Sequence, residues 1–266
     1  MDRICLSFAG VTAHEYKVLN GKINEKMTGG LRQKVSYAKS LEGELLAQSL
    51  TDEGIGYMTI EDENYPVLLK EIHDPPYILY YQGDAALMQR RMLGIVGSRK
   101  ATCYTGTGLK SILPELDRDI AIVSGLAHGA DDLAHLKAME NGLATIGVLA
   151  FGHGTHYPRS TWNTRLKMEG EGLVISEYPP AAQVAKWRFV ARNRIIAGLS
   201  EGVLVTEAEA RSGSLITLDM ALNENRHAYC MPGNIHALQS KGTNLRIQEG
   251  AKMVLSGADI MEDFNS

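Results

Sequence analysis

The sequence lacks the marks of several protein classes. Its three cysteines, Cys5, Cys103 and Cys230, are far apart and form no C-x-x-C pair, so neither a zinc site nor a disulfide framework is indicated. No run of about 18 apolar residues occurs, so no membrane span is expected. The N-terminus also lacks the charged and apolar regions of a signal peptide. We therefore expect a cytoplasmic protein, in a reducing compartment.

Familiar catalytic motifs are missing as well. No G-x-x-x-x-G-K-[ST] string and no G-x-S-x-G string occurs, which argues against a P-loop NTPase and against a hydrolase with a nucleophile elbow. His153 and His156 have no carboxylate or cysteine close by in sequence, so we expect no metal and no cofactor. The formal net charge is −4, so a nucleic-acid site would have to be a local pocket.

One stretch stands out against this background. Residues 186–199 hold four cations and two aromatic residues, and no acidic residue occurs between Glu177 and Glu201. Cations that flank Trp187 and Phe189 have the composition of a stacking platform for unpaired bases. The plainer alternative is a helix with a solvated basic face.

The order of apolar runs predicts the fold. Residues 1–52 are predicted to form a small helical module, because apolar positions around 31–46 recur at spacings of three and four. Residues 53–266 are predicted to form the main domain, with 53–90 as an extension of its edge. Within that extension, Tyr77–Tyr81 is a short β-rich run.

From residue 92 onward, short apolar runs alternate with longer helical patterns. The predicted strands are Leu93–Val96, Ile120–Val123, Thr145–Leu149, Leu173–Ser176, Val203–Val205, Ala228–Cys230 and Met253–Leu255. The predicted helices lie at 104–117, 130–141, 161–169, 190–199, 213–224 and 242–249. This alternation predicts an α/β fold with a mostly parallel sheet flanked by helices.

Loops that follow the strands should hold the site, because open parallel sheets bind ligands beyond the carboxyl ends of their strands. Four loops carry small residues, cations or hydroxyls suited to phosphate: 97–100, 186–194, 211–214 and 240–244. Free N–H groups at helix starts add to this preference for anions. None of the loops supplies a nucleophile with an obvious base. The residues favour binding a phosphodiester chain over breaking one.

The acidic helix start after the second core strand has two interpretations. Asp131, Asp132 and His135 share the start of a helix, and His128 and His135 could form a metal or acid–base site. Asp near a helix N-terminus is more often a capping residue. We therefore expect a structural role for this segment.

Several motifs, in this order along the chain, resemble the DprA/Smf family of DNA-processing proteins. They are Gly97–Arg99, Ser124–Asp131, Tyr157–Pro158, Ser176–Pro179, Phe189–Ser200, Ser212–Thr217 and Pro232–Asn234. The resemblance covers about residues 60–260. The strings R-N-R-I-I-A-G-L-S and S-G-S-L-I-T are its most specific parts.

The resemblance implies that residues 53–266 form a Rossmann-like DNA-binding domain and that the protein is a non-enzymatic mediator of recombination. Such a protein binds single-stranded DNA, loads a RecA-type recombinase onto DNA taken up in natural transformation, and forms a homodimer. The resemblance and the phosphate-binding loops together predict these DNA-binding residues: Gly97, Ser98, Arg99, Gly125, Lys186, Phe189, Arg192, Asn193, Arg194, Ser212, Gly213 and Ser214. The alternative is a nucleotide-processing hydrolase on a lysine-decarboxylase-like scaffold. Its P-G-G-x-G-T-x-x-E motif is matched only in part by Pro232-Gly233-Asn234.

Overall fold

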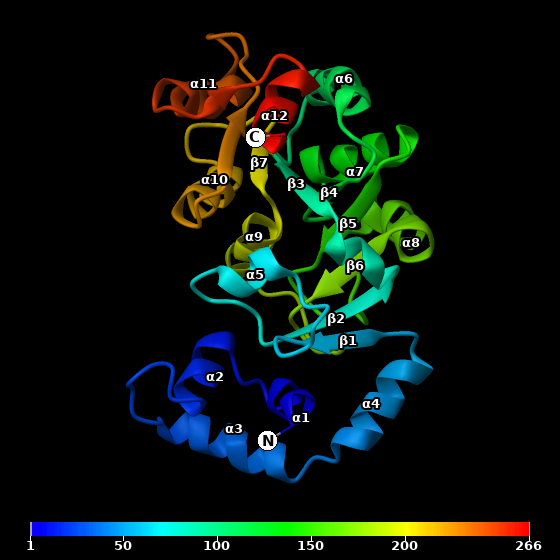
Figure 1. Cartoon of the computed structure of the whole chain (residues 1–266), viewed down its shortest axis with the longest axis vertical. Coiled ribbons are helices and arrows are strands. Elements are labelled where there is room, and N and C mark those ends of the chain that lie inside the picture. The colour runs from blue at the N-terminus through cyan, green and yellow to red at the C-terminus, as the bar shows by residue number, and fades with distance from the viewer. Residues whose placement is uncertain (1, 266) are drawn as a thin grey trace.

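The structure, a computed structural model, describes residues 2–265 and shows one sheet with helices on both faces (Figure 1). Within these residues the sheet has nine strands in the order β1-β2-β6-β5-β4-β3-β7-β8-β9. The strands are β1 Gly56–Thr59, β2 Ile78–Gly83, β3 Arg91–Val96, β4 Ile120–Ser124, β5 Ala144–Val148, β6 Leu173–Ser176, β7 Gly202–Val205, β8 His227–Cys230 and β9 Lys252–Met253. Strands β3 to β9 pair in parallel, and β1 and β2 are antiparallel to their neighbours. The predicted α/β, Rossmann-like fold is confirmed.

The helices follow the predicted alternation. They are α1 Arg3–Phe8, α2 Ala13–Leu19, α3 Gly29–Lys39, α4 Gly43–Asp52, α5 Val67–Glu71, α6 Cys103–Ile112, α7 Ala130–Glu140, α8 Trp162–Glu171, α9 Lys186–Leu199, α10 Gly213–Asn223, α11 Lys241–Gln248 and α12 Gly257–Phe264. All six helices predicted between the core strands are present. The short elements β1 and α5 and the C-terminal α12 were not predicted. No helix among residues 2–265 is long and apolar enough to span a bilayer.

The sheet has an apolar layer on each face, because successive side chains of a strand point to opposite sides. On β4, Ile120 and Ile122 belong to a cluster with buried residues of α6, α7 and α12. The alternate residues Ala121 and Val123 belong to a second cluster with α9 and α10. Burial on both faces explains why these strands appear as continuous apolar runs in the sequence.

The N-terminal helices α1–α4 pack against the antiparallel end of the sheet, below β1 in Figure 1. The Tyr16 ring stacks on the Tyr77 ring at 4.2 Å between centroids. The Tyr80 hydroxyl donates to Ser7 Oγ at 2.9 Å. Apolar residues of α1 lie in the same cluster as Tyr77 and Tyr80. The division into a module of 1–52 and a domain of 53–266 stays a prediction, since the two parts share this packing.

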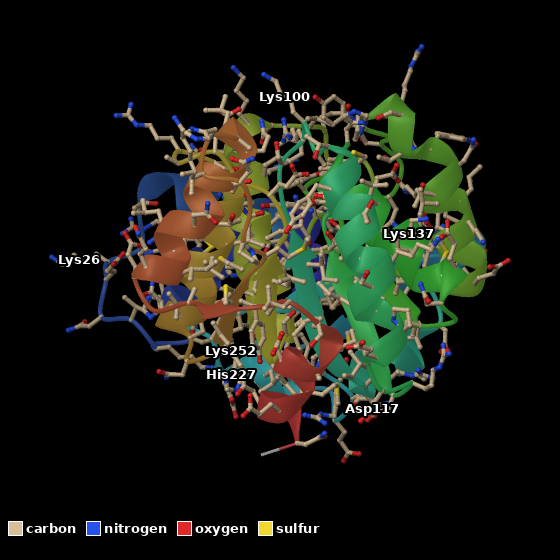
Figure 2. All side chains as sticks on the ribbon, turned by 90° about the horizontal axis from the view of Figure 1, so that it is seen from above. Lys26, Lys100, Asp117, Lys137, His227 and Lys252 are labelled. Carbon is tan, nitrogen blue, oxygen red and sulfur yellow. The ribbon has the colours of Figure 1, made fainter. Side chains whose placement is uncertain are left out.

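The chain order of the strands reverses at β3, which lies between β4 and β7. Loops that leave the carboxyl ends of β3 and β7 therefore turn to opposite sides and leave a crevice between them. In Figure 2 the label of Lys100, which follows β3, marks this end of the sheet. Asp117, His227 and Lys252 lie before or at the starts of strands and appear on the opposite side.

Candidate nucleic-acid interface

A pocket of about 430 Å³ lies at the carboxyl ends of β3 and β7. It is lined by the loop 97–100, by the segment 209–217 and by one face of α9. Nine of the twelve predicted site residues line it: Gly97, Ser98, Arg99, Phe189, Arg192, Asn193, Ser212, Gly213 and Ser214. The structure thus brings together residues more than 100 positions apart, at the place where a parallel sheet binds ligands.

The loop after β3 is held in place by close backbone packing. Ser98 N–H donates to the Glu207 carbonyl at 2.8 Å, and Ala130 N–H donates to the Ser98 carbonyl at 3.1 Å. Gly129 has φ +91°, and a Cβ there would lie 2.5 Å from the Ser98 carbonyl oxygen. Only glycine suits both requirements. The loop therefore presents Arg99 from a fixed backbone.

Glu207 fixes the start of α6 behind this loop. The side chain is buried, and its carboxylate accepts from Thr102 N–H at 2.8 Å, Thr102 Oγ1 at 2.8 Å and Thr105 Oγ1 at 2.7 Å. Three donors occupy this carboxylate. Its position at the ligand end of the sheet is therefore explained by its structural role.

Arg192 lies beneath the pocket and is only 5% exposed. Its Nη1 donates to the Val148 carbonyl at 2.8 Å. Gly125 lies directly over the guanidinium, since a Cβ at Gly125 would come within 1.8 Å of Nη1. Burial raises the pKa of the neighbouring Asp131 carboxyl, and the charge of Arg192 opposes that rise. Arg192 and Asp131 thus form the buried floor of the pocket, and the expected structural role of Asp131 fits its surroundings.

An aromatic ring forms one wall of the pocket. Phe189 is half-buried, and the Arg99 guanidinium lies 5.4 Å from its ring centroid. The Arg99 side chain itself is exposed. A cation beside an accessible ring offers a phosphate contact and a stacking surface at one point.

The opposite wall is the N-terminus of α10. Ser212 is the N-cap, and its Oγ lies 2.7 Å from Ser214 Oγ. Asn193 Nδ2 approaches the Gly213 carbonyl at 3.5 Å. The free N–H groups of a helix start attract anions.

Two cations of the pocket were not among the predicted site residues. Lys100 and Arg211 are exposed and line the pocket, although both lie in loops that the sequence indicated. With Arg99 and Arg192 they make four cations, against the carboxylates of Asp131 and Glu209. The lining therefore carries an excess of two positive charges in a protein whose net charge is −4.

Three predicted features lie outside the pocket. Arg194 points to the other side of α9, where its Nη2 donates to Glu177 Oε2 and its Nε lies 3.5 Å from Asp74 Oδ2. These ion pairs argue against the predicted phosphate contact by Arg194. Lys186, the first residue of α9, is exposed but does not line the pocket. Gly125 borders an adjoining cavity instead.

The predicted stacking platform of two aromatic residues is also divided. Trp187 is two residues from Phe189, so the helix turns the two rings to different sides. Trp187 lines a separate cavity of about 550 Å³ between α9 and the N-terminal helices, together with Arg188 and Arg194. Its ring lies 6.2 Å from the Tyr178 ring, and the Arg188 guanidinium lies 4.5 Å from that same Tyr178 ring.

Residues 240–244 do not line the pocket, contrary to expectation. Gly242 N–H donates to the Ala208 carbonyl at 2.8 Å, and a Cβ at Gly242 would lie 2.6 Å from the Glu209 carbonyl oxygen. Asn244 bonds both the N–H and the carbonyl of Gly233. This loop braces the segment after β7.

His135 and His153 have structural partners. His135 Nδ1 lies 2.7 Å from Thr145 Oγ1, and His153 bonds Gln82 Oε1 and the Tyr80 carbonyl. Burial lowers the pKa of His153 to about 4. Among residues 2–265 no cluster of three His, Cys, Asp or Glu side chains could hold a metal ion.

Comparisons with known proteins agree on one family. The family described as DNA recombination-mediator protein A matches residues 56–265. The DNA processing protein DprA of Streptococcus pneumoniae strain R6 is 42% identical over 206 residues, which cover 77% of this chain and 73% of that protein. DprA of Bacillus subtilis is 39% identical over 219 residues, covering 80% and 72%.

Two solved structures share the fold. The X-ray structure of DprA from Streptococcus pneumoniae superposes with a TM-score of 0.85 at 34% identity, covering 97% of this chain and 95% of that chain. A structure that describes how DNA processing protein A of Helicobacter pylori binds single-stranded DNA superposes with a TM-score of 0.70 at 27% identity, covering 78% and 95%.

Proposed function

Because the chain belongs to the DNA recombination-mediator protein A family, we propose that it binds single-stranded DNA and mediates recombination in natural transformation. In this role it loads a RecA-type recombinase onto the incoming strand and hydrolyses no nucleotide. The observation that carries the proposal is the pocket that Arg99, Lys100 and Arg211 share with the Phe189 ring. The single-stranded DNA bound by the Helicobacter pylori relative supports it.

The proposed contacts divide by chemistry. Exposed cations and the N–H groups at the start of α10 take phosphates, which gives affinity without base preference. The Phe189 ring takes a base face, which every base has. The proposed DNA-contacting residues are Gly97, Ser98, Arg99, Lys100, Phe189, Asn193, Arg211, Ser212, Gly213 and Ser214, with Arg192 beneath Gly125 as support.

The alternative, a nucleotide-processing hydrolase, has less support. Gly233, in the partial motif, donates its N–H to Asn244 Oδ1 and accepts from Asn244 Nδ2 at its carbonyl, and a Cβ on it would meet Ser240. The carboxylate of Glu207 is occupied by threonine donors. A general base must reach the proton that it removes, and the threonine donors already hold the Glu207 carboxylate.

The proposed partners are the recombinase and a second copy of the chain, in the cytoplasm. The segment 235–255 supports a homodimer, because five apolar side chains on it are exposed: Ile235, Leu238, Leu245, Met253 and Leu255. It lies at the β9 edge of the sheet. Exposed apolar groups of this kind mark interaction surfaces.

The test is fluorescence anisotropy with a labelled oligothymidine of about 20 nucleotides, its duplex and a labelled mononucleotide, at low and high salt. We expect tight, salt-sensitive binding to the single strand alone. Binding of the mononucleotide alone, or release of free base from a nucleoside monophosphate, would overturn the mediator in favour of the hydrolase.

A further inference from the structure

Aromatic side chains continue beyond the candidate site onto the loop that follows β5. The Tyr157 ring lies 6.0 Å from the Phe189 ring, and both contact Phe151 edge-to-face at 6.5 Å. Phe151 is buried, whereas Tyr157 is 45% exposed. A small cavity of about 70 Å³ that borders Arg99, Phe189 and Tyr157 joins this group to the main pocket.

A second aromatic pair, His156 and Trp162, lies on the same stretch of chain as Tyr157. The Trp162 and His156 ring centroids are 3.8 Å apart with the ring planes inclined at 46°, and Trp162 remains 47% exposed. Burial, together with Arg165, lowers the pKa of His156 to about 4, so the imidazole beside Trp162 is neutral at neutral pH. A surface hollow of about 480 Å³ is bordered by His156, Arg159 and Trp162. Arg159 is exposed and forms no ion pair among the residues that the structure describes.

The loop that carries these rings is anchored from below. Arg165 is 5% exposed, and its guanidinium donates to the carbonyls of His153 at 2.6 Å and Thr155 at 2.5 Å. Its Nε pairs with Glu169 at 2.7 Å. Gly154 N–H donates to the Pro180 carbonyl at 3.0 Å. A loop held in this way presents its side chains without a large ordering cost on binding.

We propose that residues 156–162 extend the single-strand site: Tyr157 stacks on the base next to the one at Phe189, Trp162 stacks on a base further along, and Arg159 contacts the phosphate backbone between them. The proposal rests on the proposed function. Aromatic rings interspersed with cations are what a sequence-tolerant single-strand track requires. Arg99 and Phe189 border both the main pocket and the small aromatic cavity, which gives the track continuity.

The chain provides a matched control in its other tryptophan. Trp187 is 58% exposed and lies beside Arg188, much as Trp162 lies near Arg159. Trp187, however, lines the cavity on the other side of α9. The two positions thus differ in location more than in composition.

The experiment compares oligothymidines of increasing length against wild type, Trp162→Ala, Arg159→Ala and Trp187→Ala. We expect Trp162→Ala to bind a long oligomer about tenfold more weakly than wild type and to bind the shortest bound oligomer equally well. Arg159→Ala should reduce the gain in affinity that comes with a longer oligomer, and it should also reduce the salt dependence of that gain. Trp187→Ala should match wild type. Equal urea midpoints for the four proteins show that each is folded.

A spectroscopic readout is independent of affinity. The sequence has two tryptophans, so Trp187→Phe leaves Trp162 as the only indole. We expect saturating long oligothymidine to quench its emission and a short oligomer to leave it unchanged. The extension would be overturned by three results together: unchanged emission, wild-type affinity of Trp162→Ala and Arg159→Ala for every oligomer length, and reduced affinity of Arg99→Ala. That outcome would leave the proposed function standing. Failure of wild type to bind any single strand would overturn both.

Discussion

The two faces of helix α9 have the same kinds of residue and opposite surroundings. One face, with Phe189 and Asn193 exposed in part and Arg192 beneath them, borders the open pocket. On the other face Arg188 stacks on Tyr178, and Arg194 is held by Glu177 and Asp74. The first face is open to a ligand, whereas on the second face, which borders the other cavity, both arginines already contact the protein's own groups. A run of cations therefore does not act as one surface when it lies on a helix.

The largest effect should follow from removing the charge beneath the pocket face. Arg192→Met leaves the buried Asp131 without its neighbouring cation and the Val148 carbonyl without its donor. We expect a loss of about 4 kcal/mol in the free energy of unfolding, measured by urea denaturation. The double variant Arg192→Met/Asp131→Asn should recover part of it. Equal losses in the single and double variants would show that the two charges do not interact.

On the other face, Arg194→Gln should cost stability and leave DNA binding unchanged. The substitution removes the ion pairs to Glu177 and Asp74, in which the Arg194 side chain is only 16% exposed. We therefore expect the free energy of unfolding, measured by urea denaturation, to fall by about 3 kcal/mol. Affinity of the folded variant for oligothymidine should equal that of wild type. Weak binding with unchanged stability would instead restore the phosphate contact that the sequence predicted for Arg194.

Acid should weaken the fold through His135, which lies behind the pocket face. Burial, and to a lesser degree Arg192, lowers the pKa of His135 from 6.5 to about 3. Below pH 6.5 the unfolded chain binds a proton at His135 that the folded protein does not bind. The contribution of His135 to the free energy of unfolding is therefore full above pH 6.5 and falls as the pH drops toward 3. Between pH 7 and pH 5 the loss from this group is about 2 kcal/mol. Urea unfolding of His135→Gln should show a decline smaller by that amount. Parallel pH profiles for the two proteins would contradict the assignment to His135.

The smallest expected effect is on the salt dependence of DNA binding, compared between one arginine on each side of α9. Arg99→Ala should lower the slope of log affinity against log salt by about 1, because one phosphate contact is lost. Arg188→Ala should leave the slope unchanged, since its guanidinium lies on the Tyr178 and Trp187 rings. Equal slopes for both variants would remove the distinction between the two faces.

Much of the fold could be predicted because buried parallel strands leave a clear pattern. Strands β3 to β8 are apolar runs bounded by polar turns, and their predicted limits differ from the observed ones by at most two residues. Strand β1 was missed because its four residues are only partly buried and depend on pairing with β2. Helix α12 was missed although the sequence held a signal, the capping box of Ser256 and Asp259.

The loops of the site could be predicted, but the direction of the α9 side chains could not. The partners that turn Arg194 away are Asp74, 120 positions earlier, and Glu177. Only the fold brings the loop before β2 to the end of β6. Likewise, nothing in the local sequence shows that Gly125 leaves room for the Arg192 guanidinium.

The cysteines that exclude a zinc site also determine how the protein can be labelled. Cys5 and Cys230 are buried, and burial raises the pKa of both thiols, to about 12 for Cys230. Cys103 is exposed at the first residue of α6, directly after the loop that carries Arg99. A thiol-directed fluorophore on the native chain would therefore attach at one position, four residues after Arg99, so that the arrival of a strand could be followed without any engineered residue.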